Sequence, residues 1–146
     1  YDNFSYCFVK KYDYPAILTL KRLKKNFTIG GVNKNINIRS IKIKHGLIDS
    51  IAYVVDKKIA YISDANEFYK KDYDYFKGLK YLIIDCLRFN KHPSHFNLEE
   101  VLKIAHSLKP KKTILTNLHS DLDYKQLLKM LPNNIIPGYD GLSVTI

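Results

Sequence analysis

The sequence predicts a mixed α/β fold, in which one sheet carries helices on at least one face. Two observations support this prediction. The first half of the chain is rich in short apolar runs that suit strands, and the second half follows a β-α-β-α-β order. A length of 146 residues suits one domain with a buried core, so we interpret 1–146 as a single domain.

The first half is predicted to hold strands. The clearest lies in the segment 35–46, where isoleucines recur with a period of two, as in a half-buried strand that stops at Gly46. Two runs around a lysine-rich turn are expected to form an antiparallel hairpin. Besides the strand in 35–46, the predicted strands span 4–9, 17–23, 51–56 and 58–64, and the last two form the hairpin.

The second half alternates helices and strands. A helix is predicted over 66–78, because aromatic residues form a rough stripe that ends at Gly78. Another is predicted over 97–110, with Asn97 as its cap. The remaining predictions are a strand over 79–88 covered on both faces, a strand over 111–117, a short helix capped by Asp123, and a closing strand or strand pair over 135–146.

The composition indicates a basic, reduced protein. The net charge is +10, and the first 44 residues carry ten Lys or Arg against two Asp, which suits an anionic partner or reflects a lysine-rich genome bias. Cys7 and Cys86 form no CxxC pattern and are interpreted as reduced core residues. No membrane-spanning run is present, so a cytoplasmic location is favoured. Met130 is the only methionine, and we expect a piece of a longer protein.

Four apolar runs end in side chains that suit metal binding or acid-base chemistry. These are His45, Asp64, Asp85 and His119. Convergence of two histidines and an aspartate at one sheet edge would supply the donors that zinc, manganese or iron prefers. Each has a plainer interpretation: Asp64 as a helix cap, His45 as a turn residue, and Asp85 as a buried hydrogen-bonding group that ties down a loop with Arg88.

Two further histidines lie in the loop before the helix capped by Asn97. Pro93 stiffens this loop, and a histidine near a helix N-terminus is well placed to donate to an anion held there. His95 is the better candidate and His92 a weaker, substrate-binding one. The alternative for both is a solvated loop histidine.

The ordered segments "KHG", "AYISDANEF", "LIIDCLRFNKHPSHFNLEEVL", "LTNLHSDLDY" and "YDGL" carry a resemblance that covers most of 4–146. Together they resemble the C-terminal part of metallo-β-lactamase-fold hydrolases. The most similar branch is phosphodiesterase-like and includes the phosphonate-pathway cyclic-phosphate phosphodiesterase, with tRNase Z more distant. The resemblance implies part of an αββα sandwich, with helices on the outer face and two metals at the sheet edge.

The resemblance also implies roles for individual residues. His45 would bind the first metal, Asp64 would bridge both metals, and His119 would be the last histidine, on the second metal. His95 resembles a histidine that stabilises the phosphoryl transition state or protonates the leaving group. Many relatives read T-H-x-S-H where this chain has Asn117, and His119 is the favoured ligand because imidazole is a better zinc donor than an amide.

The remaining ligands of that family come from a His-x-His-x-Asp-His motif. The motif is absent from these residues and would belong upstream of Tyr1, so 1–146 is interpreted as the C-terminal portion of the fold and is expected to be inactive alone.

The expected function of the intact protein is hydrolysis of a phosphodiester in a cyclic phosphate, nucleotide or RNA end, with two divalent cations (zinc or manganese). A homodimer is possible. The alternative is a non-catalytic nucleic-acid or protein-binding module with a basic N-terminal region. A thioester or lactam hydrolase is a rival within the same class.

Overall fold

A computed structural model describes residues 2–10 and 13–145; residues 1, 11–12 and 146, which the predicted domain includes, lie outside this description. The strands are β1 (Asn26–Gly30), β2 (Asn35–His45), β3 (Ile48–Val55), β4 (Ile59–Ile62), β5 (Tyr81–Asp85), β6 (Lys112–Thr116) and β7 (Ile135–Pro137). The helices are the 3₁₀ helices η1 (Asp2–Cys7) and η2 (Lys70–Phe76) and the α-helices α1 (Leu98–Leu108) and α2 (Tyr124–Met130).

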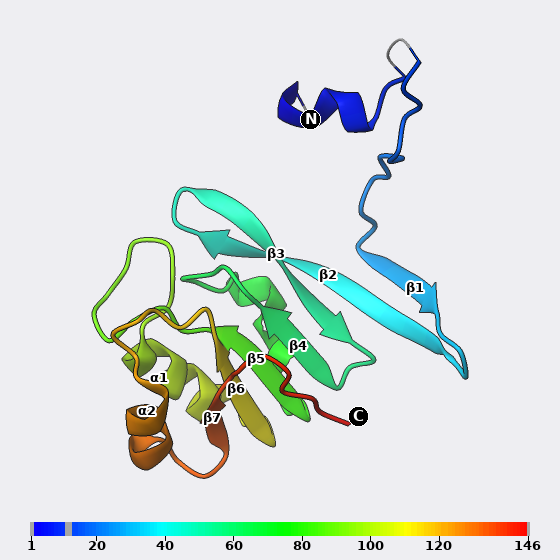
Figure 1. The fold of residues 1–146 in the computed structure, drawn as a ribbon. Coiled ribbons are helices and arrows are strands. Elements are labelled where there is room, and N and C mark those ends of the chain that lie inside the picture. Colours follow the sequence, from blue (N-terminus) through cyan, green and yellow to red (C-terminus); the bar gives the residue numbers. More distant parts are fainter. Residues whose placement is uncertain (1, 11–12, 146) are drawn as a thin grey trace.

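The seven strands form one mixed sheet in which spatial order equals sequence order (Figure 1). Strands β1 to β4 pair antiparallel, and β4 to β7 pair parallel. The predicted hairpin is therefore present as β3 and β4, and each later parallel strand is reached through a helical crossover. The mixed α/β class predicted from the sequence is confirmed.

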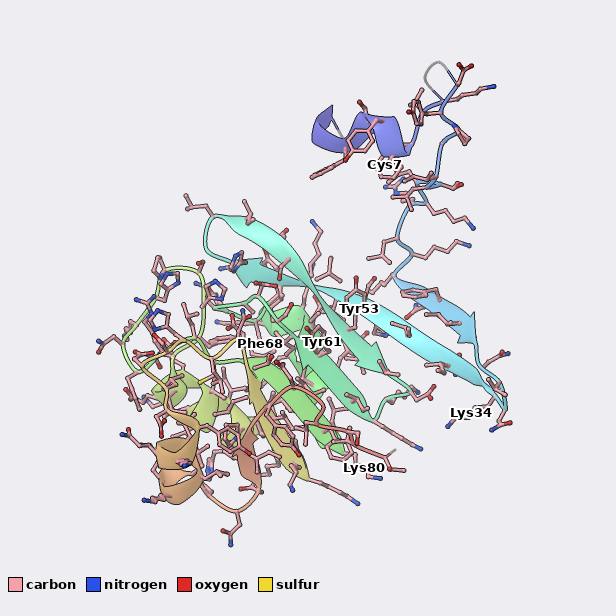
Figure 2. All side chains as sticks on the ribbon, viewed as in Figure 1. Cys7, Lys34, Tyr53, Tyr61, Phe68 and Lys80 are labelled. Atoms are coloured by element: carbon pink, nitrogen blue, oxygen red, sulfur yellow. The ribbon has the colours of Figure 1, made fainter. Side chains whose placement is uncertain are left out.

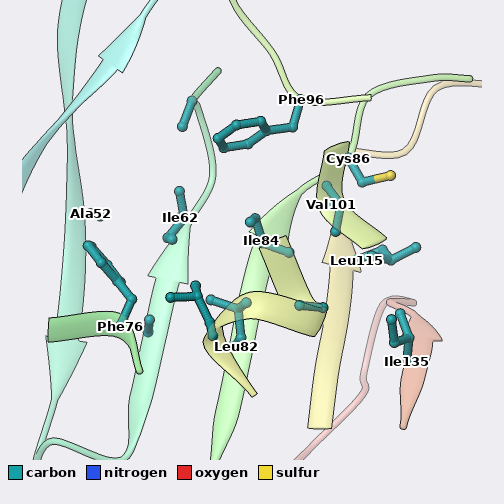
Figure 3. Packing of buried hydrophobic residues seen from close by; sticks show 14 of the residues in the cluster. Ala52, Ile62, Phe76, Leu82, Ile84, Cys86, Phe96, Val101, Leu115 and Ile135 are labelled. Carbon is teal, nitrogen blue, oxygen red and sulfur yellow. The ribbon is translucent and has the colours of Figure 1, made fainter. Parts of the chain in front are cut away.

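The core lies between one face of the sheet and the helices. Phe76 of η2, Val101 of α1 and Leu127 of α2 belong to the same buried cluster as Leu82 and Leu115 of the central strands. Figure 3 shows four of these side chains converging from the two layers, with Phe76 and Val101 facing the strand residues. Burial of this apolar surface holds the helices against the sheet and fixes the strand ends that carry the polar residues described below.

The opposite face of the sheet has no helical layer among the residues that the structure describes. Tyr53 and Tyr61 stand on this face (Figure 2), and 43% of Tyr61 is exposed. Ile83 of β5, which alternates with the buried Leu82 and Ile84, is only half-buried. The described residues therefore form one helical layer and one sheet of the predicted αββα sandwich, and the face of the sheet opposite to the helices carries apolar and aromatic side chains.

Two strand predictions near the N-terminus are wrong. Residues 4–9 begin within the 3₁₀ helix η1, and 17–23 form no strand. Figure 1 shows this part of the chain running away from the sheet, so no neighbouring strand satisfies its backbone groups. The strand that does form, β1, starts later, at Asn26, where it pairs with Arg39 of β2. Cys7 is half-buried here and is not a core residue, whereas Cys86 is buried; both are free thiols.

The second half follows the predicted order with shorter elements. Asn97 caps α1 through a capping box with Glu100, as its Oδ1 accepts from the Glu100 amide at 2.8 Å. Asp123 caps α2 by accepting from the Gln126 amide at 2.9 Å. The helix predicted over 66–78 is only the 3₁₀ turn η2, and the closing strand is limited to the three residues of β7. None of the described helices is long and apolar enough to cross a membrane.

Candidate metal centre

Four strands deliver polar residues to one edge of the sheet. Strands β2 and β4 both run antiparallel to β3, and β5 and β6 run parallel to β4, so the carboxyl ends of all four strands lie at the same edge. His45 is the last residue of β2 and Asp85 the last of β5, while Asp64 follows β4 by two residues. Asn117 comes directly after β6.

Three of the predicted residues meet at this edge. His45, Asp64 and His95 each offer a ligand atom, and these atoms lie within 4.8 Å of one another. The rings of His45 and His95 pack edge to face with their centroids 4.6 Å apart. His95 comes from the long loop between β5 and α1, which folds back over the ends of the strands.

Hydrogen bonds orient both imidazoles towards the group. The Nδ1 of His45 lies 2.7 Å from the Ser94 carbonyl oxygen, and the Nδ1 of His95 lies 2.5 Å from Oδ2 of Asp85. Since both partners accept, each Nδ1 carries the proton and each Nε2 presents a lone pair. Metal-binding histidines use this arrangement, in which an oxygen acceptor on one nitrogen fixes the tautomer of the other.

Asp85 holds the group in place through hydrogen bonds. Its side chain is fully buried, and Oδ2 accepts from the Ala65 amide at 3.0 Å as well as from His95. Burial raises the pKa of Asp85, and the bonds from Ala65 and His95 act against this shift. Asp85 therefore has the predicted buried hydrogen-bonding role, with the Ala65 amide and His95 as its partners. The predicted partner Arg88 forms no ion pair among the described residues, and the ion pair of Asp85 is with His95.

The second-metal candidates are less closely placed. The Nδ1 of His119 lies 3.0 Å from Oδ1 of Asp121, and half of the His119 side chain is exposed. His119 is not part of the three-residue group. Asn117 has a left-handed backbone (φ 64°), and its amide donates to the Ser63 carbonyl at 2.8 Å. Since Ser63 directly precedes Asp64, this bond places Asn117 beside the group, although the sequence favoured His119.

Two residues that position the group were missed from the sequence. Oδ1 of Asn66 accepts from the Gly46 amide at 2.9 Å, and its Nδ2 donates to the Pro93 carbonyl at 3.0 Å. Asn66 thus links the tip of the β2–β3 hairpin to the loop that carries His95. Gly46 (φ 64°) passes so close to this loop that an added Cβ would lie 3.0 Å from the Ser94 Cβ. The only sequence signal was the position of Asn66, two residues after Asp64.

The donor set fits a divalent metal. Imidazole nitrogen and carboxylate oxygen are donors that zinc binds in proteins, and His45 and Asp64 offer one of each within the group. Oδ2 of Asp64 accepts from the Ser63 hydroxyl at 2.7 Å, which leaves Oδ1 for a metal. Cys86 is not a candidate ligand, because burial, with the Asp85 charge, raises its pKa to about 12 and keeps the thiol protonated.

Comparison with known families decides the relationship. The family model for the beta-lactamase superfamily domain matches residues 2–117. The chain belongs to this superfamily. The predicted metallo-β-lactamase-type fold is thereby confirmed. His45, Asp64 and His95, which meet at the sheet edge, come from the segments on which the resemblance was based.

Individual proteins and solved structures are also similar to this chain. A crystal structure described as a new diphosphatase from the PhnP family is 26% identical, with a TM-score of 0.78, over 86% of this chain and 48% of that one. Human tRNase Z, short form, shares the fold at 14% identity and a TM-score of 0.62, over 84% of this chain and 46% of that one. An octanoyltransferase of Porphyromonas gingivalis is 26% identical over 148 residues, which are 99% of this chain and 30% of that protein. The chain thus spans half or less of each relative.

Proposed function

We propose that the intact protein is a metal-dependent hydrolase that cleaves a phosphodiester in a cyclic phosphate, a nucleotide or an RNA end. The observation that carries this proposal is the convergence of His45, Asp64 and His95 within 4.8 Å at a sheet edge. The relative named as a diphosphatase, which has the TM-score of 0.78, supports a phosphate-containing substrate.

The proposed centre holds two divalent cations, zinc or manganese. His45 and Asp64 would bind the first, Asp64 would be shared, and His119 would bind the second. We favour His119 over Asn117 because imidazole is a better zinc donor than an amide, and Nε2 of His119 has no partner among the described residues. Bound cations of this kind lower the pKa of a water molecule and neutralise phosphate charge.

The residues of this chain would then bind the substrate and move protons. We assign His95 to protonate the leaving oxygen through Nε2, because Asp85 holds the proton on Nδ1 and stabilises the charged ring. Exposed cations of the first third, such as Arg22 and Lys25, would attract the anionic substrate. The cytoplasmic location and the homodimer stay predictions.

Metal content and turnover of bis(p-nitrophenyl) phosphate by the intact protein test this proposal. His45→Ala and Asp64→Asn are expected to lose bound metal and turnover together. His95→Ala is expected to keep its metal but to lose roughly hundredfold or more in kcat. Loss of metal in His95→Ala would show that His95 is a ligand and that its assignment as the acid is wrong.

Further outcomes separate the alternatives. His119→Ala is expected to reduce the metal content from two ions to one, and Asn117→Ala to leave it at two; the reverse result would assign the second metal to Asn117. An intact protein that binds RNA but no metal would be the non-catalytic module. Faster turnover of a thioester than of the phosphodiester would assign the protein to the rival hydrolase class.

A further inference from the structure

The tip of the β2–β3 hairpin carries two exposed apolar side chains beside the candidate metal centre. Gly46 and Leu47 form the turn, and β3 begins at Ile48. Leu47 is fully exposed, and Ile48 is 66% exposed. Gly46 supplies the positive φ (64°) that such a short hairpin turn needs, but turn positions are otherwise filled mainly by small or polar residues. The turn itself therefore does not explain the two apolar side chains.

The strand register places Ile48 next to a proposed metal ligand. Ile48 pairs directly with His45 across the hairpin. Directly opposite residues of antiparallel strands project from the same face of the sheet, with their Cβ atoms about 5 Å apart. Two residues before His45 on the same strand, and hence on the same face, Ile43 is buried in the core. Ile48 thus continues the core-facing side of the sheet to its edge, where it lies beside the imidazole of His45.

Hydrogen bonds fix the position of the hairpin tip. The Gly46 amide donates to Oδ1 of Asn66 at 2.9 Å, and Nδ2 of Asn66 donates to the Pro93 carbonyl at 3.0 Å. The Lys44 amide, one strand position before the metal ligand, donates to the Glu67 carbonyl at 3.1 Å. Figure 1 shows the tip and the loop between β5 and α1 at the same end of the sheet. The two apolar side chains are therefore presented by an ordered backbone, which lowers the entropy cost of binding a ligand there.

His45 has two kinds of neighbour at this edge. The ring of His95 packs against it with the centroids 4.6 Å apart, and the ring of His92 lies 5.1 Å from that of His95. These imidazoles come from the loop between β5 and α1, whereas the neighbour across the hairpin is the aliphatic Ile48. A phosphate held at His45 would thus have an apolar side chain nearby as well as polar ones. The substrate-binding role of His92 stays a prediction.

We propose that Leu47 and Ile48 form an apolar wall of the metal centre, which selects phosphate esters that carry a flat ring next to the phosphate. This inference rests on the proposed function and narrows its substrate class. In a nucleotide or an RNA end the base supplies such a ring, whereas the cyclic phosphate of a bare sugar has none. Contact with the ring removes the apolar surface of both partners from water, and this favours binding.

Two pairs of ligands test the wall by isothermal titration of the intact protein. Phenylphosphonate and methylphosphonate differ by an aryl ring, and adenosine 5′-monophosphate and ribose 5-phosphate differ by a base. We expect the ligand with the ring to bind about tenfold more tightly in each pair. Ile48→Thr should lower this ratio by about threefold or more, and Ile48→Val by less than about twofold. Threonine and valine have the same shape, so the comparison isolates the loss of apolar contact.

Val32→Thr is the matched control. Val32 is a fully exposed apolar residue in the β1–β2 connection, at the other end of the 11-residue strand β2 and therefore about 30 Å from the tip. Its substitution should leave both ratios within about twofold of the wild type. Circular dichroism and thermal unfolding check that each variant is folded. Adding Leu47→Asn, a substitution that suits a turn, to Ile48→Thr should remove the remaining preference for the ring.

The outcomes separate this inference from the proposed function. Equal binding within both pairs by the wild type, or the same ratios in Ile48→Thr as in the wild type, would overturn the wall. A preference in the phenyl pair alone would overturn the base as its occupant. Because binding is measured without turnover, a ring preference in a protein that does not hydrolyse bis(p-nitrophenyl) phosphate would support the wall while the phosphodiesterase proposal fails. Hydrolysis without a ring preference would have the opposite meaning.

Discussion

At the scale of single residues, the candidate centre depends on one buried carboxylate. Asp85 accepts from His95 and from the Ala65 amide, so it fixes both a donor of the group and the residue that follows Asp64. Its Oδ1 has no partner among the described residues. Burial without full compensation raises the pKa of Asp85, and this costly arrangement is understandable where it orients a neighbouring imidazole.

We predict that Asp85→Asn lowers the kcat of the intact, metal-loaded protein on bis(p-nitrophenyl) phosphate by about 10–100-fold and leaves the metal content unchanged, because an amide can offer its N–H₂ to His95 and favour the wrong tautomer of the proposed acid. Steady-state kinetics and metal analysis measure the two quantities. Asp74→Asn, at an exposed aspartate paired with Lys77, is the control and should turn over as the wild type does. An unchanged kcat in Asp85→Asn would contradict the orienting role.

Residues whose chemistry is visible in their type could be predicted from the sequence. His45 and Asp64 were found because each ends an apolar run, and strand ends gather at a sheet edge. Ser94 could not be found, since it acts through its backbone carbonyl, which every residue has. The unpaired state of Arg88 also had no signal, because pairing depends on which carboxylates the fold brings near.

At the scale of elements, a hydrogen bond from Tyr69 to Asp49 connects strand β3 to the segment after β4. The Tyr69 hydroxyl donates to Oδ1 of Asp49 at 2.6 Å, and Lys42 lies 3.1 Å from Oδ2 of Asp49. The Tyr69 bond, followed by that of Lys42, lowers the pKa of Asp49. Because Tyr69 belongs to the stretch that leads away from Asp64, this tie helps to hold that loop against the β2–β3 hairpin.

We predict that Tyr69→Phe raises the pKa of Asp49 towards its ordinary value and destabilises the fold in a pH-dependent way. A lowered carboxyl pKa stabilises the folded state above the pKa of the unfolded chain, about 4, and this contribution disappears as the pH falls through the folded-state value. The stability difference from wild type should therefore be present at a pH of about 7 and shrink as the pH falls below about 4. Urea unfolding at both pH values and NMR titration of Asp49 measure it.

We predict that Asn97→Ala destabilises the protein by about 1–2 kcal/mol. The side chain of Asn97 is buried and accepts from the Glu100 amide, while the Glu100 carboxylate accepts from the Asn97 amide at 3.0 Å. Urea unfolding gives the free energy. Glu99→Gln, at an exposed pair with Lys103, should cost less than about 0.5 kcal/mol; an equal cost would contradict a special role for the cap.

Elements with their own local signals were predicted best. Helix α1 carries a cap and an apolar face within its own sequence, and β2 carries a period-two pattern. The segment 4–9 is apolar and aromatic like a strand, but strand formation also needs a neighbour, which the sequence pattern does not contain. Similarly, the aromatic stripe over 66–78 does not require a full α-helix, because the shorter 3₁₀ helix η2 already places Phe76 in the core.

At the scale of the whole molecule, the two faces of the sheet differ. One face is sealed by η2, α1 and α2, and the other presents Tyr53, Tyr61 and Ile83. We predict that the 146-residue chain on its own associates through this second face, and that the double substitution Tyr53→Lys and Tyr61→Lys reduces the association. Analytical ultracentrifugation measures it. A monomeric wild-type chain would contradict this prediction.

The order of the strands has a consequence for how the molecule forms. Since each strand from β2 to β7 pairs with the one synthesised just before it, the sheet can grow by addition to a single advancing edge. None of the strands that the structure describes has to be inserted between two others that have already paired. Nascent chains that end after β5 should therefore already contain an ordered β2–β5 sheet, with α1, β6, α2 and β7 added in turn as they leave the ribosome.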